Sequence, residues 1–301
     1  MLLVSYTHHG DTTRRLGVRH QDTVVDVAAL GAGIPGLGAA PASVLDLVHA
    51  GPDALAALTE RLARPVPEAA RHPLEKVALK APLRPGKIVG VGLNYTEHVA
   101  ESARTLDTDK ELPQRPVLFS KPATAVTGPD EPVLHNGDLT AQLDWEVELA
   151  VVIGRTARRV RPEDALGHVF GYSIVNDISA RDQRRSGQWF YSKGQDSYAP
   201  FGPAVRTADD VPDPQALDLS LRVNGEVKQK GNTRHMLFRI PELIADITAG
   251  MTLEPGDVIA TGSPAGVGAS FVPQQFLTPG DVVEATIESI GTLRNPVVDA
   301  R

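Results

Sequence analysis

The first part of the chain shows two kinds of hydrophobic pattern. Residues 2–30 alternate as short strands around turns, and residues 41–64 place apolar side chains at roughly helical spacing. The helical positions are Leu45, Val48, Leu55, Leu58 and Leu62. These patterns predict a small α/β unit.

Prolines then interrupt the chain over residues 64–85. They stand at positions 65, 67, 73, 82 and 85, which is typical of a connector and unfavourable for a helix or a central strand. We therefore expect a domain boundary near residue 80. A small N-terminal α/β domain would cover residues 1–80, and a catalytic domain residues 81–301.

Beyond this boundary the pattern changes to short apolar runs of strand length. They cover residues 87–92, 147–153, 169–175, 217–223, 257–261 and 281–287. Asn224 and Gly225 separate two such segments and are the residues that a type I′ hairpin turn prefers. The expected fold class is α+β, mostly β, with few helices.

Composition and charge narrow the class of protein. The 301 residues are 42% hydrophobic and 22% charged, as in ordinary soluble globular proteins. A formal charge of -7 argues against nucleic acid as the principal partner, because phosphate binding needs clustered cations. There are no cysteines, which excludes disulfides, thiolate zinc sites and a cysteine nucleophile.

The most apolar stretch, residues 24–48, is interrupted by Asp26, Pro35, Pro41 and Asp46. The first ten residues lack a basic segment followed by an apolar core. We therefore expect neither a signal peptide nor a membrane span. The expected compartment is the cytoplasm, with no membrane partner.

Two carboxylates stand at the beginning of the apolar run at 147–153. Glu146 and Glu148 are two residues apart, so in a strand they point to the same face. Like charges on one face repel unless a cation or solvent separates them, which suits a hard divalent ion with oxygen ligands. A solvated strand face is the alternative.

A third carboxylate, Asp177, follows the run at 169–175. Strand ends with Asp or Asn commonly open onto sites, which favours a ligand role. Asp177 is equally suited to cap a following helix. From the residues alone the two interpretations stay open.

A glycine-containing strand runs into a short helical segment near residue 94, where Asn94 is a possible helix cap. His98 and Glu101 are three residues apart and would share one helical face. The carboxylate could orient the imidazole as a general base, or the two could be an ordinary surface pair.

Two further segments have a composition suited to anions. Lys193 lies among aromatic and turn residues, and a partly desolvated lysine can stabilise an enolate or oxyanion. Residues 260–268, which include Thr261 and Gly262, carry enough glycine to bring backbone N–H groups near an anion. The chain has no P-loop, dinucleotide fingerprint, Gly-x-Ser-x-Gly elbow or His-Glu-x-x-His motif.

Taken in order, several segments resemble the fumarylacetoacetate hydrolase superfamily over roughly residues 85–301. They are GLNYTEHVAE, FSKPATAVTGP, DWEVELAVVIG, GYSIVNDISARDQ, KGQDSYAPFGP and TGSPAGVG. The resemblance implies a catalytic domain built as a mixed β-sandwich roll, and commonly a homodimer. Gly194 and Gln195 depart from the residues that many relatives carry after the lysine.

The resemblance also implies roles for individual residues. It makes Glu146, Glu148 and Asp177 the ligands of one divalent ion, usually Mg²⁺, with Mn²⁺ as an alternative. It makes His98, Glu101 and Lys193 catalytic. Substrate contacts would come from Lys121, Gln195, Tyr198, Thr261 and Gly262, and residues 105–115 would form a variable lid.

The activity expected from this site is metal-dependent hydrolysis of a C–C bond in a small 1,3-dicarbonyl or acylpyruvate-type 2-oxo acid. His98 would remove a proton from water, and the metal ion and Lys193 would hold the departing enolate. Decarboxylation of an oxaloacetate-like acid, hydration and keto–enol isomerisation use the same enolate chemistry and remain alternatives. A non-catalytic small-molecule binder is the alternative from another class.

Overall fold

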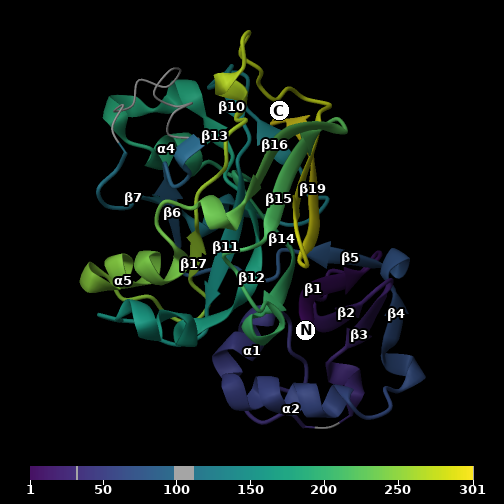
Figure 1. The fold of residues 1–301 in the computed structure, drawn as a ribbon. Helices are drawn as coiled ribbons and strands as arrows, with labels where there is room; N and C mark the ends of the chain where they lie inside the picture. The colour runs from purple at the N-terminus through teal and green to yellow at the C-terminus, as the bar shows by residue number, and fades with distance from the viewer. Residues whose placement is uncertain (32, 98–111, 301) are drawn as a thin grey trace.

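The computed structural model describes residues 1–31, 33–97 and 112–300, and this part of the chain is mostly β (Figure 1). A 12-stranded sheet runs in the order β4-β3-β2-β1-β14-β12-β11-β17-β6-β7, with β5 beside β1 and β8 beside β14. Its strands are β1 (Leu2–His8), β2 (Arg15–His20), β3 (Thr23–Asp26), β4 (Arg71–Pro73), β5 (Val77–Lys80), β6 (Ile88–Gly92), β7 (Val117–Lys121), β8 (Val126–Thr127), β11 (Val147–Ile153), β12 (Val169–Asn176), β14 (Ala199–Thr207) and β17 (Val258–Ala260).

A five-stranded sheet and a short ladder complete the strands. The five-stranded sheet has the order β16-β15-β18-β19-β9, and β10 pairs with β13. These strands are β9 (Val133–His135), β10 (Leu143–Asp144), β13 (Ser179–Ala180), β15 (Asp218–Val223), β16 (Glu226–Asn232), β18 (Val282–Ile287) and β19 (Gly291–Asp299).

Helices are few and lie at the periphery. Figure 1 shows α1 and α2 at the bottom beside the purple N-terminal strands, and α4 and α5 at the left. The α-helices are α1 (Val44–Ala50), α2 (Pro52–Leu62), α4 (Phe190–Lys193) and α5 (Ile240–Gly250). Short 3-10 helices are η1 (Ala28–Leu30), η2 (Glu68–Ala70), η3 (Leu74–Lys76), η4 (Ala123–Ala125), η5 (Pro162–His168), η6 (Arg181–Gln183), η7 (Arg185–Gly187), η8 (Ala208–Asp210), η9 (Thr233–His235) and η10 (Gly268–Ser270).

Strand β11 is buried along its whole length because both of its faces are covered. Leu149 and Val151 belong to one core cluster, which also contains residues of the five-stranded sheet such as Leu221. Ala150 and Val152 belong to a second cluster, which includes α1 and the N-terminal strands. Alternation along the strand thus gives a continuous apolar run with a different core on each side.

The sequence pattern anticipated the principal strands. Each of the six short apolar runs contains a strand: β6, β11, β12, β15, β17 and β18. Asn224 and Gly225 have positive φ angles of 52° and 80° between β15 and β16, as a type I′ turn requires. The predicted α+β, mostly β class is confirmed.

Two regions differ from the expectation. The proline-rich stretch 64–85 is not only a connector, because β4 and β5 lie within it, with β4 at the edge of the sheet. Strand β14 lies outside the predicted apolar runs and carries two prolines, Pro200 and Pro203. Pro203 lies where the register of the pairing between β14 and β12 shifts. Because the hydrogen-bond ladder between these two strands is already irregular there, the missing N–H donor of proline costs little.

The N-terminal strands join the rest of the sheet through β1 and β14, where Leu2 lies opposite Arg206. The helical spacing over residues 41–64 corresponds to two helices, α1 and α2, separated at Gly51 with φ 84°. The division of the chain at residue 80 stays a prediction. Among the described residues, no helix is both long enough and apolar enough to cross a membrane.

Candidate metal centre

Antiparallel pairing of β11 and β12 brings the three predicted ligands together. Val147 lies opposite Asn176, so the residues just outside this pair, Glu146 and Asp177, are neighbours. The Asp177 N–H donates to the Glu146 carbonyl at 2.8 Å, and the Asn176 side chain accepts from the Glu146 N–H at 2.9 Å. Asp177 caps no helix, because it leads into β13, and the following η6 begins after Ala180.

The three carboxylates form one compact acidic group. Glu146, Glu148 and Asp177 each offer an oxygen, and these oxygens lie within 4.8 Å of one another. All three side chains are buried, with residue exposures of 5%, 1% and 0%. The solvated strand face considered from the sequence is therefore wrong.

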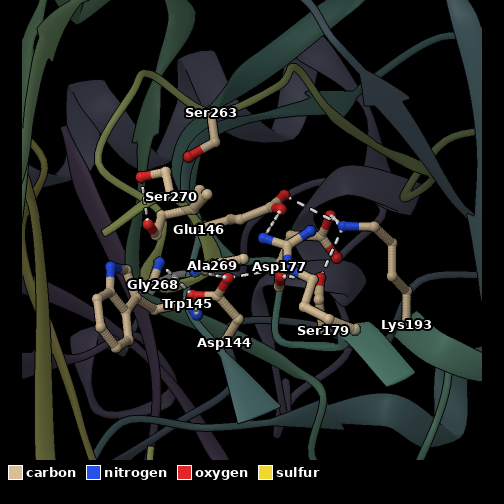
Figure 2. A network of polar contacts seen from close by, with 12 residues as sticks. Asp144, Trp145, Glu146, Asp177, Ser179, Lys193, Ser263, Gly268, Ala269 and Ser270 are labelled. Carbon is tan, nitrogen blue, oxygen red and sulfur yellow. Dashed lines mark hydrogen bonds and ion pairs between the residues drawn. The ribbon is translucent and has the colours of Figure 1, made fainter. Parts of the chain in front are cut away.

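Two lysines and an arginine bind two of the three carboxylates. Figure 2 shows one of them, Lys193, beside Glu146 and Asp177. The Lys193 Nζ donates to Asp177 Oδ2 at 2.5 Å, to Glu146 Oε2 at 3.1 Å and to Ser179 Oγ at 2.8 Å. Lys121 is fully buried and donates to Asp177 Oδ1 and to the Ile178 carbonyl. Arg181 Nη2 donates to Glu146 Oε1 at 2.5 Å.

Burial and charge act in opposite directions on the two lysines. Burial lowers the pKa of Lys121 and outweighs the attraction of Asp177. For Lys193, burial also lowers the pKa, but the carboxylates of Asp177 and Glu146 outweigh it and the net shift is upward. Of the two lysines, Lys193 is thus the one that the acidic group holds in its charged form.

Glu148 is the carboxylate that this arrangement leaves uncompensated. Its Oε2 accepts from the Gly262 N–H at 2.9 Å, and no lysine or arginine among residues 1–31, 33–97 and 112–300 forms an ion pair with it. Burial raises the pKa of Glu148 well above its usual value, and the charges of Asp177 and Glu146 raise it further. A divalent ion between the three groups would supply the missing positive charge, so the residues present fit a hard cation with oxygen ligands.

Two aromatic rings, those of Phe119 and Trp189, lie beside Lys193. Its Nζ is 4.9 Å from the ring centroid of Phe119 and 6.0 Å from that of Trp189. A Cβ at Gly90 would overlap the Phe119 ring, and one at Gly92 would overlap the Trp189 ring. The glycines of β6 therefore make room for the rings that exclude water from the lysine.

Of the other residues predicted to contact the substrate, Gly262 reaches the acidic group directly. The Thr261 hydroxyl donates to the Leu149 carbonyl at 2.9 Å, and Gly262 reaches Glu148 through its N–H. Tyr198 is buried, and its hydroxyl has no hydrogen-bond partner among the described residues. Gln195 is half-buried, and its Nε2 makes a long contact to the Tyr191 carbonyl at 3.4 Å. Substrate-binding roles for these residues stay predictions.

His98 and Glu101, the predicted base and its partner, lie outside the described residues. The Asn94 side chain donates to the Phe238 carbonyl at 3.1 Å and to the Thr261 carbonyl at 2.7 Å, and it accepts from the Phe238 N–H at 2.8 Å. Asn94 therefore joins the end of β6 to two distant loops. A helix cap at Asn94 stays a prediction.

Asp144 and Arg181 stand within the sequence motifs given above, but no role was predicted for them. Arg181 joins Asp144 to Glu146, with its Nε 2.8 Å from Asp144 Oδ2. Burial opposes its charge, but the two carboxylates hold the Arg181 pKa above its ordinary value. In the sequence, the one sign of this pair is an acidic residue, Asp144, two positions before the Glu-x-Glu pair. Its partner Arg181 is 37 positions away, so only the folded structure reveals the contact.

The fold and site thus define a mostly β protein with a buried, oxygen-lined candidate site for a divalent metal ion. The family model described as "Fumarylacetoacetate (FAA) hydrolase C-terminal" matches residues 87–298. The chain therefore belongs to the fumarylacetoacetate hydrolase family.

Individual relatives carry the names of different enzymes. The chain is 45% identical over 229 residues to oxaloacetate tautomerase YisK of Bacillus subtilis (strain 168), covering 75% of each chain. It superposes on fumarylacetoacetate hydrolase from psychrophilic Exiguobacterium antarcticum with TM-score 0.82 and 38% identity, covering 100% of both chains. Maleylpyruvate hydrolase from Sphingobium sp. SYK-6, solved in complex with manganese (II) ion and pyruvate, gives TM-score 0.80 and 32% identity over 100% of both chains.

Proposed function

We propose that this chain is a divalent-metal-dependent enzyme that interconverts the keto and enol forms of a small 2-oxo dicarboxylate such as oxaloacetate. The observation that carries the proposal is the buried group of Glu146, Glu148 and Asp177, with Lys193 bonded to two of its members. The name of the relative that is 45% identical supports the choice of tautomerisation over the other enolate reactions.

Glu146, Glu148 and Asp177 would hold the ion. Their donors are all carboxylate oxygens, which favours Mg²⁺, with Mn²⁺ as the alternative. When bound, such an ion supplies Lewis acidity toward a carbonyl oxygen and neutralises charge on the enolate.

The protein's own residues contribute binding, charge and exclusion of water. The ammonium of Lys193 favours negative charge on a nearby substrate oxygen. Phe119 and Trp189 place apolar rings beside that ammonium, which lowers the local polarity and strengthens its electrostatic effect. His98, with Glu101 to orient it, is proposed to move the proton at the carbon next to the carbonyl.

The test is the decay of enol oxaloacetate, followed by its ultraviolet absorbance, with metal-stripped protein and with Mg²⁺ restored. Tautomerisation predicts acceleration only with the ion, and its loss in Glu148→Ala. Acceleration that persists after stripping, or that survives in Glu148→Ala, would contradict a role for the acidic group.

C–C hydrolysis of an acylpyruvate-type acid is the second candidate, and the likeness to maleylpyruvate hydrolase favours it. Pyruvate release from an acylpyruvate panel distinguishes it, because tautomerisation releases none. His98→Ala separates hydrolysis further from decarboxylation of oxaloacetate, since only hydrolysis requires an activated water. Pyruvate release from oxaloacetate that His98→Ala leaves intact would favour a decarboxylase.

We also propose, from the family resemblance, that the protein is a homodimer in the cytoplasm with its domains divided near residue 80. Light scattering of the purified chain tests the dimer. Limited proteolysis tests the division, which predicts first cleavage close to residue 80. A monomer would contradict the proposed dimer, and first cleavage elsewhere would contradict the proposed division.

A further inference from the structure

Asp144 is a fully buried carboxylate outside the group of proposed metal ligands. Its Oδ1 accepts from the Gly268 N–H at 2.6 Å and from the Trp145 N–H at 2.8 Å. Its Oδ2 accepts from the Ala269 N–H at 3.0 Å and from Arg181 Nε at 2.8 Å. Figure 2 shows Asp144 with Gly268 and Ala269, on the side of the network opposite Lys193.

Arg181 connects this carboxylate to a metal ligand. Its Nε faces Asp144, and its Nη2 donates to Glu146 Oε1 at 2.5 Å. The other oxygen of Glu146, Oε2, accepts from Lys193 at 3.1 Å. Each oxygen of Glu146 is therefore held by a different cation, and the planar guanidinium has a shape that an ammonium cannot reproduce.

The loop at residues 262–270 is attached to the site at both ends. At its beginning the Gly262 N–H donates to Glu148, and at its end Gly268 and Ala269 donate to Asp144. A Cβ at Gly268 would lie 2.7 Å from Asp144 Oδ1, so the close approach requires glycine.

The middle of the loop is fixed by two side chains. Gln229 Nε2 donates to Ser263 Oγ and to the Pro264 carbonyl, each at 2.8 Å. Trp145 Nε1 donates to the Gly266 carbonyl at 3.0 Å. One loop therefore contacts the Glu148 side of the acidic group directly and the Glu146 side through Asp144 and Arg181.

We propose that Asp144 and Arg181 are a positioning pair, which sets the orientation of Glu146 for the metal ion and couples ion binding to the order of the loop at 262–270. The inference rests on the proposed metal site. Neither residue takes part in the chemistry, and their effect passes through Glu146 and the loop. Partners that orient ligands in this way typically change metal affinity about 10- to 100-fold when they are removed.

The experiment is a calorimetric titration of metal-stripped protein with Mn²⁺, together with hydrogen exchange of the amides at residues 262–270. Asp144→Asn keeps the shape but removes the charge that Arg181 needs. It should weaken Mn²⁺ binding about 10- to 100-fold and speed exchange at Gly268 and Ala269. In the wild type, Mn²⁺ should slow exchange at these amides.

Two further variants keep the test decisive. Arg181→Lys retains the positive charge but cannot reach both carboxylates, so it should weaken binding to a similar extent even if Asp144→Asn fails to fold. Asp182→Asn is the matched control. Asp182 accepts from Thr140 and Ala141 and touches neither Glu146 nor the loop at 262–270, so its loss should leave affinity unchanged.

Wild-type Mn²⁺ affinity in both Asp144→Asn and Arg181→Lys, with exchange at Gly268 and Ala269 unaltered, would overturn the inference and leave the metal site standing. Absence of any Mn²⁺ binding by the wild type would overturn both the inference and the proposed function. Equal weakening by Asp182→Asn would show a general loss of structure and would also overturn the positioning role.

Discussion

Buried carboxylates occur in two regions of this molecule under opposite conditions. Asp26, at the end of β3, accepts hydrogen bonds from Tyr6 at 2.7 Å and from the N–H groups of Ala28 and Ala29 at 2.8 and 3.2 Å. In the acidic group, three carboxylates share a space in which their oxygens approach within 4.8 Å. A carboxylate whose acceptors are filled contributes to folding, whereas crowded carboxylates store repulsion that a bound cation can relieve.

The neighbours of each region reflect the same contrast. Burial raises the pKa of the Tyr6 phenol, and the hydrogen bond to Asp26 adds to the shift, so the phenol stays a neutral donor. In the acidic group the carboxylate with the raised pKa is Glu148, which is itself a proposed metal ligand. Two other carboxylates, Asp177 and Glu146, contribute to that shift. The first arrangement is complete within the chain, and the second needs a further positive charge.

The largest expected effect comes from removing the uncompensated carboxylate. Glu148→Ala should reduce metal-dependent turnover of oxaloacetate at least about 100-fold, because a direct ligand matters more than the residues that orient ligands. The metal-stripped variant should be no less stable than the stripped wild type, since a crowded charge has gone. Enol decay and urea unfolding measure the two quantities. A variant that unfolds more easily and keeps its turnover would reverse the assignment.

The second prediction concerns Lys193, the cation bonded to two of the three carboxylates. Lys193→Met should lower turnover by about 10²- to 10³-fold, as expected for loss of a group that stabilises developing negative charge. Binding of Mn²⁺ should persist, because the ammonium shares Glu146 and Asp177 with the ion. Turnover kinetics and a Mn²⁺ titration of the same variant distinguish a role of Lys193 in turnover from a role in ion binding. Loss of ion binding with turnover intact would contradict the role proposed for Lys193.

Metal removal should affect the acidic group and leave the Asp26 region unchanged. Mg²⁺ at about 100 times its dissociation constant should raise the free energy of unfolding by about 2.7 kcal/mol. The increment should vanish in Glu148→Ala and persist in Asp26→Ala. Urea unfolding with and without the ion gives all three values. An increment of equal size in Glu148→Ala would place the stabilising ion elsewhere.

The smallest effect on function is expected at Asp26. Asp26→Ala removes the acceptor of one phenol and two backbone donors, so the free energy of unfolding should fall by about 1–3 kcal/mol. Turnover of the folded variant should match the wild type. A drop in turnover comparable to that of Glu148→Ala would mean that the two regions do not differ in the way described.

Local pattern predicted much of the fold. Apolar runs of strand length located six strands because each run is buried on one or both faces, and Asn224-Gly225 marked its hairpin. Strand β14 could not be found in this way, because Pro200 and Pro203 carry the signal of a turn. Only its pairing with β12 and β1 makes it a strand, and such pairing is not visible in local sequence.

The site was predictable to a similar extent. Strand alternation placed Glu146 and Glu148 together, but the approach of Asp177 follows from the register of β11 against β12. Arg181, Asp144 and the loop at 262–270 meet across 37 and more than 120 positions of sequence. No role was predicted for Gly90 and Gly92, which make room for the rings of Phe119 and Trp189 through tertiary packing.

The metal site is tested most directly by an anomalous difference map from crystals of this protein soaked with Mn²⁺. We expect one peak bound by oxygens of Glu146, Glu148 and Asp177, and no such peak in Glu148→Ala. A map without that peak, from protein that retains metal-dependent turnover, would contradict the assignment of these three carboxylates as the metal site.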